Sequence, residues 1–265
     1  MNSGIPQHLS HPSVFLDYLS PSPQRCPTPC VYSSSMKNKN FTELIYILDR
    51  SGSMQGMEEP AVESFNRFLK DQKSVEGQAN ITLMLFDTEF LKPINAQDIM
   101  TVNEMTANRF EPRGATALLD AIGISIKETR KRIKALPEQE QPGKVIFAIF
   151  TDGYENSSRL YEWSEISTKI AKRTSRDGWE FLFLAANEDA IATASRLNIK
   201  QNNASQVEFS KAAMSSWGGS ASKKVRAMRE ESMGMDYDSA DRNRPLASMV
   251  KKDLEEKKRK SRKTS

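Results

Sequence analysis

The chain has 265 residues, of which 38% are hydrophobic, and this is enough apolar surface for one sizeable core. Its longest uninterrupted apolar runs, 145–150 and 181–186, have six residues each, far fewer than the ~20 that cross a bilayer. No positively charged n-region opens the chain, so no secretory signal is expected and the cytoplasm is the default location. We therefore expect a globular protein without membrane contact.

The formal net charge of +4 is unevenly distributed along the chain. Residues 222–265 hold 14 basic and 8 acidic side chains, whereas residues 1–221 hold 24 and 26. Any attraction to nucleic acid is therefore expected to come from the tail, through weak, salt-sensitive contacts with phosphates. Alternatively, the basic tail is only a solvated, flexible end of the chain without a binding role.

Residues 1–38 are predicted to be a disordered N-terminal extension, because they are rich in Pro, Ser and polar residues and lack a periodic apolar pattern. Both cysteines, Cys26 and Cys30, lie there without a second Cys or His pair nearby, so no zinc site is expected. Met36, which opens the polar lead into the first predicted strand, is a candidate for an alternative start of translation. The rest of the chain is divided into an α/β domain at 40–215 and a terminal helix with a basic disordered tail at 216–265.

Short apolar runs alternate with amphipathic segments in the predicted domain. Four runs are expected to be strands buried on both faces of a sheet, namely 44–48, 81–86, 145–150 and 179–186. Residues 88–94 follow the second run closely enough to form an antiparallel edge hairpin, and 206–209 are a candidate for the last strand.

Helical spacing of apolar residues fills the segments between these strands. Helices are expected to begin near Pro60 and to span about 117–136, 160–177, 189–197 and 211–230. Because right-handed crossovers place helices on both sides of a parallel sheet, the alternation predicts a doubly wound fold. We expect a mostly parallel, six-stranded, Rossmann-like α/β sheet with helices on both faces.

Polar side chains gather where the predicted strands end. Asp49, Ser51 and Ser53 follow the first strand in YILDRSGSMQG, Asp152 follows a buried strand in VIFAIFTDGYEN, and Thr116 opens a helix in RGATALLDAI. Ligands of open parallel sheets bind beyond the carboxyl ends of the strands, so these five side chains are candidates for one site. Two carboxylates and three hydroxyls form an all-oxygen set, which suits Mg²⁺, Mn²⁺ or Ca²⁺ and disfavours zinc or copper.

The three segments, taken together, resemble von Willebrand factor type A domains. Residues 49–53 match the D-x-S-x-S signature of that family, GAT at 114–116 looks like its threonine loop, and TDG at 151–153 looks like its second-aspartate motif. The resemblance covers about residues 40 to 215. It implies a six-stranded, mostly parallel fold and a metal-ion-dependent adhesion site.

The resemblance also implies a role for each of the five candidates. Ser51 and Ser53 would bind the metal directly, and Thr116 directly or through water. Asp49 and Asp152 would act mostly through water or through hydrogen bonds to the serines. A Glu or Asp carboxylate of a protein partner would complete the octahedron, and the module is expected to work inside a larger complex.

A Mg-dependent hydrolase is one competing interpretation, since some phosphatases hold a nucleophilic aspartate at a strand end. Such sites generally need a second acid two residues on and a lysine, but residue 51 is serine and no lysine is close to Thr116 or Asp152 in sequence. A nucleophilic serine would need a base, and the only histidines are His8 and His11. We therefore expect no enzymatic activity.

Three other acids, Asp87, Asp120 and Glu155, lie near the candidate site in sequence but outside the motifs, so turn, surface or helix roles are expected for them. The predicted function is a divalent-metal-dependent protein-binding module that recognises an acidic residue of its partner. The other alternative is an accessory protein that contacts nucleic acid through its basic tail.

Overall fold

The computed structural model of the protein describes residues 37–264. Of the extension predicted to be disordered, 1–38, residues 1–36 lie outside the described residues, as do the two cysteines; Asn38 already belongs to the first strand, so the predicted boundary is slightly too late. None of the helices described between residues 37 and 264 is both long enough and apolar enough to span a bilayer.

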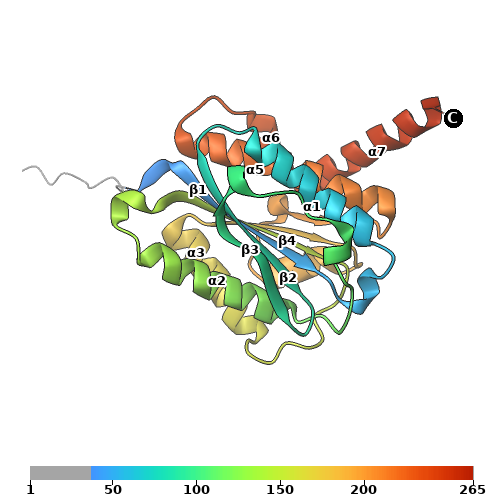
Figure 1. The fold of residues 1–265 in the computed structure, drawn as a ribbon, viewed down its shortest axis with the longest axis horizontal. Helices are drawn as coiled ribbons and strands as arrows, with labels where there is room; N and C mark the ends of the chain where they lie inside the picture. The colour runs from blue at the N-terminus through green and yellow to red at the C-terminus, as the bar shows by residue number, and fades with distance from the viewer. Residues whose placement is uncertain (1–36, 265) are drawn as a thin grey trace, which may run out of the picture. The chain divides into compact units, whose positions relative to one another are not determined.

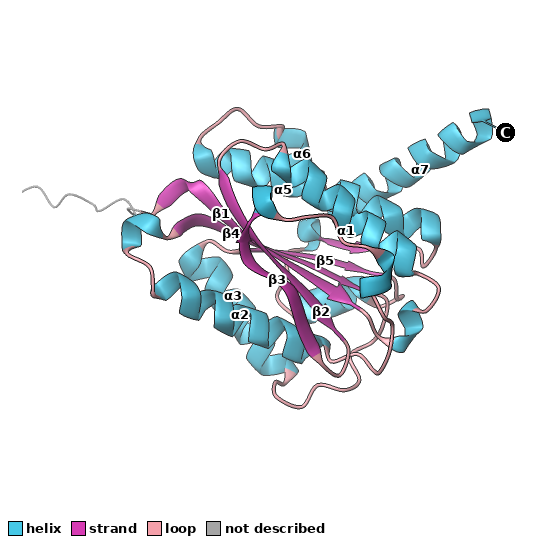
Figure 2. Cartoon of the chain, in the orientation of Figure 1, coloured by secondary structure: helices cyan, strands magenta, loops and turns pink. Residues whose placement is uncertain are grey.

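Six strands form one sheet in the order β3-β2-β1-β4-β5-β6 (Figure 2). They are β1 (Asn38–Asp49), β2 (Gln78–Phe86), β3 (Phe90–Asp98), β4 (Pro142–Thr151), β5 (Glu180–Ala185) and β6 (Ala204–Gln206). All neighbouring strands are parallel except β2 and β3, which form an antiparallel hairpin at one edge. The predicted six-stranded, mostly parallel sheet and its edge hairpin are confirmed. The last strand lies slightly before the predicted 206–209.

The central strands are buried on both faces, which explains their nearly continuous apolar sequences. Along β1, Leu44, Tyr46 and Leu48 point into one core, whereas Ile45 and Ile47 point into the other. Each such side chain contributes about 1.5–3 kcal/mol on burial, so the middle of the sheet is the most strongly stabilised part of the domain. This rigid centre fixes where each strand ends.

Helices cover both faces of the sheet, as predicted (Figure 1). One face is covered by α1 (Glu58–Lys73), α5 (Lys211–Met233) and α7 (Leu246–Thr264). The other is covered by α2 (Leu118–Lys134), α3 (Trp163–Asp177) and α4 (Ala190–Arg196). A short helix, α6 (Ser239–Asn243), connects α5 to α7.

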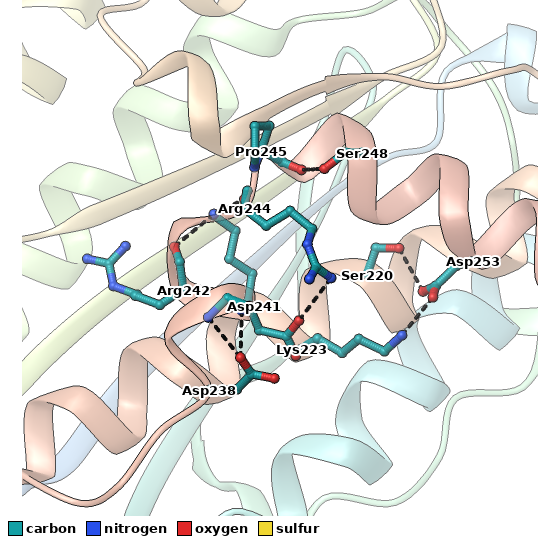
Figure 3. A network of polar contacts seen from close by, with 11 residues as sticks. Ser220, Lys223, Asp238, Asp241, Arg242, Arg244, Pro245, Ser248 and Asp253 are labelled. Atoms are coloured by element: carbon teal, nitrogen blue, oxygen red, sulfur yellow. Dashed lines mark hydrogen bonds and ion pairs between the residues drawn. The ribbon is translucent and has the colours of Figure 1, made fainter.

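The C-terminal segment differs from the flexible tail that we predicted, because residues 246–264 form α7. Apolar residues at helical spacing, Leu246, Met249 and Val250, are buried at the start of this helix. On the next turn Asp253 accepts hydrogen bonds from Ser220 Oγ (2.8 Å) and Lys223 Nζ (2.6 Å) of α5 (Figure 3). The first half of α7 is therefore attached to α5 by both apolar and polar contacts.

A fully buried lysine stabilises the connection around α6. Lys224 Nζ donates hydrogen bonds to the carbonyl oxygens of Arg242 (3.1 Å) and Arg244 (2.8 Å). Burial lowers the pKa of this ammonium group to about 8, and the charge of Arg242 adds to the shift. Nearby, Asp238 caps α6 through its carboxylate, as Figure 3 shows. The positive charge is thus held by carbonyl oxygens rather than by a carboxylate.

Candidate functional site

Two adjacent parallel strands deliver the two predicted acids to one edge of the sheet. Leu48 of β1 is paired with Phe150 of β4, so the chain leaves both strands at the same level. Thr151 Oγ1 then donates a 2.5 Å hydrogen bond to Asp49 Oδ2. This bond joins the end of β1 to the end of β4, one residue before Asp152.

The turn after β1 folds back over Asp49. The backbone N–H of Ser51 donates to Asp49 Oδ1 (2.8 Å), and residues Gly52–Met54 form a single 3-10 turn. The hydroxyl oxygens of Ser51 and Ser53 consequently lie 3.1 Å apart. Ser51 is buried and Ser53 is exposed, so the pair reaches from the interior to the surface.

Two backbone hydrogen bonds attach the threonine loop to this turn. The N–H of Gly52 donates to the carbonyl of Gly114 (3.1 Å), and the N–H of Arg113 donates to the carbonyl of Arg50 (2.9 Å). Gly114 has a φ of +66°, a left-handed conformation that glycine adopts without strain. The loop can therefore run alongside the turn and bring Thr116 to the same edge.

Thr116 lies directly against the loop that carries Asp152. A Cβ atom added to Gly153 would be 2.7 Å from Thr116 Oγ1, so the glycine of TDG is needed for this close approach. The N–H of Thr116 donates to Asn156 Oδ1 (2.9 Å), and the N–H of Asn156 donates back to the Thr116 carbonyl (3.1 Å). All three predicted segments thus meet at one edge of the sheet.

The environment of Asp49 disfavours its charged form. Burial raises the pKa of this carboxyl group to about 7. Hydrogen bonds from Thr151 and Ser51 oppose the shift, whereas the neighbouring charge of Asp152 adds to it. The two acids are therefore close enough to repel each other.

Asp152 faces the two serine hydroxyls. Burial raises its pKa, and the hydroxyls of Ser53 and Ser51 oppose that shift. Its Oδ1 atom is buried without a hydrogen-bond partner. Neither Asp49 nor Asp152 forms an ion pair with any residue in the described part of the chain. The site therefore holds two close acids and an unpaired carboxylate oxygen without a protein cation.

The residues present fit a hard divalent cation. Between residues 37 and 264 no group of three or more His, Cys, Asp or Glu side chains is arranged for a metal ion. A cation at this edge would therefore depend on the hydroxyls of Ser51, Ser53 and Thr116 in addition to Asp49 and Asp152. The unpaired oxygen of Asp152 and the all-oxygen donor set match what Mg²⁺, Mn²⁺ and Ca²⁺ require.

A buried ion pair next to the site was missed by the sequence analysis. Asp87 accepts a hydrogen bond from the N–H of Glu89 (2.5 Å), consistent with the predicted turn role. In addition, its Oδ2 atom lies 3.0 Å from Arg50 Nη2 and 3.1 Å from Arg113 Nε. Asp87 therefore holds the middle of the D-x-S-x-S turn and the threonine loop together. One feature of the sequence could have predicted this ion pair: Asp87 directly follows β2, and β2 is the second parallel neighbour of β1.

The other two acids have structural roles in loops. Glu155 accepts a hydrogen bond from the N–H of Leu119 (2.9 Å) and so caps the start of α2, a helix role as predicted. Asp120 accepts hydrogen bonds from the backbone N–H groups of residues 159–161. It is only 3% exposed, so the surface alternative for this residue is wrong. Both acids order the loop that follows Asp152.

No protein-family model matches the sequence, and no curated protein matches it. Among solved structures, proximal thread matrix protein 1 from the mussel byssus has a TM-score of 0.52 at 14% identity, covering 70% of this chain and 46% of that chain. A von Willebrand factor type A protein from Catenulispora acidiphila has a TM-score of 0.47 at 14% identity, covering 73% and 43%. Manganese-loaded TRAP protein from Plasmodium vivax has a TM-score of 0.42 at 13% identity, covering 57% and 59%.

The chain spans less than two thirds of the length of each of these three proteins. At such identities the likeness concerns the fold alone. The six-stranded, mostly parallel α/β fold that the resemblance implied is confirmed by the strand order and pairing.

Proposed function

We propose that the chain is a divalent-cation-dependent protein-binding module that recognises an acidic side chain of a partner. The observation that carries the proposal is the pair of close acids, Asp49 and Asp152, without a protein cation and with one buried, unpaired carboxylate oxygen. A bare acid pair in this position is costly, and a cation would offset that cost.

The donor set also favours recognition of an acid. Ser51, Ser53 and Thr116 are neutral ligands, so a cation bound among them keeps much of its positive charge. When bound, Mg²⁺ or Mn²⁺ supplies a Lewis-acidic contact for a carboxylate. A Glu or Asp side chain of a partner is the natural protein group to make that contact.

Exposed aromatic side chains offer a surface for the rest of such a partner. Tyr154, two residues after Asp152, is 53% exposed, and Phe209, just beyond the carboxyl end of β6, is 41% exposed. Aromatic residues are enriched in protein interfaces and depleted elsewhere on surfaces. We propose that the partner contacts this edge of the sheet around the cation, within a larger cytoplasmic complex and without catalysis.

Isothermal titration with Mg²⁺ and Mn²⁺ tests the cation requirement. The wild-type chain is expected to bind, and Ser51→Ala/Ser53→Ala is expected to bind at least ~10-fold more weakly, because two neutral ligands are lost. Ser175→Ala/Ser195→Ala is the matched control, since both serines are exposed and lie near the C-terminal ends of α3 and α4. Equal affinity in all three proteins, or no affinity in any, would disprove the proposal.

Affinity capture tests the acidic partner. A partner retained in Mg²⁺ should be released by EDTA and should not bind the Ser51→Ala/Ser53→Ala variant. Substitution of one Glu or Asp of that partner by Gln or Asn should abolish retention. Retention that is insensitive to both changes would show that the module binds by another surface.

A further inference from the structure

A groove between α2 and α3 collects basic side chains. The two helices lie side by side on the same face of the sheet (Figure 1), and the groove between them has a volume of about 240 Å³. Its basic lining residues are Lys127 and Arg130 of α2 and Lys169, Lys172 and Arg173 of α3. No acidic side chain lines it. We refer to it as the α2–α3 groove.

Four of these five cations have no ion-pair partner. Lys127, Arg130, Lys169 and Lys172 form no ion pair with any residue that the structure describes. Elsewhere on α2, Arg132 is paired with Glu43 and Glu128 with Lys92. The four charges are therefore not neutralised by an acid of the described chain.

Arg173 is the fixed member of the group. It is buried, forms an ion pair with Asp177, and its guanidinium lies 5.8 Å from the centre of the Trp179 ring. Burial lowers the pKa of Arg173, Asp177 opposes the shift, and the charges of Arg130 and Arg176 add to it. Arg130 and Arg173, on opposite walls of the groove, are thus close enough to repel each other, and an external anion would relieve that repulsion.

An aromatic ring and a buried apolar side chain complete the lining. A Cβ atom at Gly123 would clash with the ring of Tyr161, so this ring is packed directly against the backbone of α2. Lys169 Nζ lies 5.3 Å from the centre of the same ring. The apolar lining residue, Ile126, is itself buried. The groove is therefore concave, firmly built and positively charged.

We propose that the α2–α3 groove binds the phosphate backbone of a single-stranded nucleic acid. Lys127 and Arg130 are one helical turn apart on one wall, and Lys169 and Lys172 are one turn apart on the other. Such pairs are about 5–6 Å apart at their Cβ atoms, so the positive charge extends along both walls instead of marking a single point. An extended polyanion uses this arrangement better than a small anion does.

The lining of the groove favours a single strand over other polyanions. Salt-dependent contacts with Lys and Arg beside an aromatic ring are typical of proteins that bind single strands. A bilayer, in contrast, is bound by exposed apolar side chains next to basic ones, and Ile126 is buried. This site is separate from the candidate cation site and does not depend on it.

Fluorescence anisotropy with a fluorescein-labelled 12-nucleotide poly(U) RNA, in EDTA and 50 mM NaCl, tests the proposal on the full chain. Lys127→Glu/Lys172→Glu should weaken binding at least ~10-fold and lower the slope of log affinity against log salt by about 1.4, the value for two phosphate contacts. Lys251→Glu/Lys252→Glu on α7 is the control with the same charge change, since both lysines are exposed and unpaired among the described residues. The RNA affinity of this control variant should fall by less than about 3-fold.

Several outcomes would overturn the proposal. These are equal losses in both double variants, loss only in the α7 variant, no RNA binding by the wild-type chain, and displacement of the RNA by equimolar ATP or by phosphatidylserine vesicles. If the Glu variants melt at a lower temperature, Lys127→Gln/Lys172→Gln provides the same comparison without charge reversal. Photocrosslinking of 4-thiouridine RNA to the wild-type chain should label the peptide containing Tyr161, and labelling confined to residues 246–264 would contradict the assignment.

Discussion

Strand β1 carries two buried acids, and their surroundings are opposite. Glu43, near the start of the strand, is paired with Arg132 of α2. Asp49, at its end, has no cation in the described chain and lies close to a second acid, Asp152. Burial raises the pKa of both carboxyl groups, but Arg132 opposes the shift at Glu43, whereas Asp152 adds to it at Asp49. One acid thus has a cation within the domain and the other has none among the described residues.

The difference separates an acid that stabilises the fold from an acid suited to binding. The five oxygen-bearing side chains meet only at the carboxyl edge of the sheet, where three loops are joined. Glu43 has none of these neighbours. Substitutions at the two ends of β1 should therefore have opposite signatures, one in cation binding and the other in the free energy of unfolding.

The largest effect is expected at the carboxyl edge. Asp152→Ala removes the unpaired carboxylate and should lower Mn²⁺ affinity by more than the roughly 10–100-fold that loss of an outer-shell partner costs. Titration calorimetry measures this change. The free energy of unfolding without metal should stay the same or rise, because a source of repulsion with Asp49 is removed. If Asp152→Ala binds Mn²⁺ as tightly as the wild type, the carboxyl end of β1 does not differ from the Glu43 end in cation binding, and the prediction is wrong.

At the other end, Glu43→Gln should destabilise the fold by about 2–4 kcal/mol, because Arg132 loses its buried partner. Urea unfolding gives the magnitude. Mn²⁺ affinity should be unchanged, and a large loss of affinity would mean that the two ends of β1 are coupled.

A smaller effect is expected from the bond between the strand ends. Thr151→Val removes the hydroxyl that donates to Asp49 and should lower stability by about 1–2 kcal/mol. Thr151→Ser keeps the hydroxyl and serves as the control. If Val and Ser variants unfold at the same urea concentration, the hydrogen bond makes no net contribution.

The last effect is a pH dependence of stability and concerns a buried cation, the counterpart of these acids. The pKa of Lys224 is about 8 in the folded chain, below its ordinary value, so the unfolded chain binds more protons between about pH 8 and 10. Stability from this group should therefore rise with pH in that window. The difference in unfolding free energy between the wild type and Lys224→Met, measured at pH 7.5 and pH 10, should shift in favour of the wild type. A constant difference would show that Lys224 does not titrate there.

The meeting of Asp49 and Asp152 could be predicted from the sequence because both follow apolar runs typical of buried parallel strands. The contacts that hold them could not. The Thr151–Asp49 hydrogen bond requires β1 and β4 to be neighbours, and the Arg50–Asp87 ion pair requires β1 and β2 to be neighbours. Strand order is a property of tertiary packing, which the spacing of residues along one chain does not specify.

The distribution of charge along the sequence was the least reliable basis for predicting the structure. The basic side chains of the α2–α3 groove come from two segments that are separated in sequence, so no single run of charge marks the groove. In α7, Leu246, Met249 and Val250 recur at helical spacing and attach the helix to the domain. The many charged residues of the same segment led us to predict a flexible tail instead. Only helix packing reveals which charges share a surface.

The turn after β1 and the threonine loop are joined by main-chain hydrogen bonds, from Gly52 to Gly114 and from Arg113 to Arg50. Those bonds are indifferent to most side chains that the two segments display outward. Substitutions of outward-facing residues in these segments can therefore change the surface around the site while the inner oxygen atoms keep their places; under the proposed function, such substitutions would change the partner. Divergence in binding preference should thus be fastest in positions immediately surrounding an invariant chemical centre.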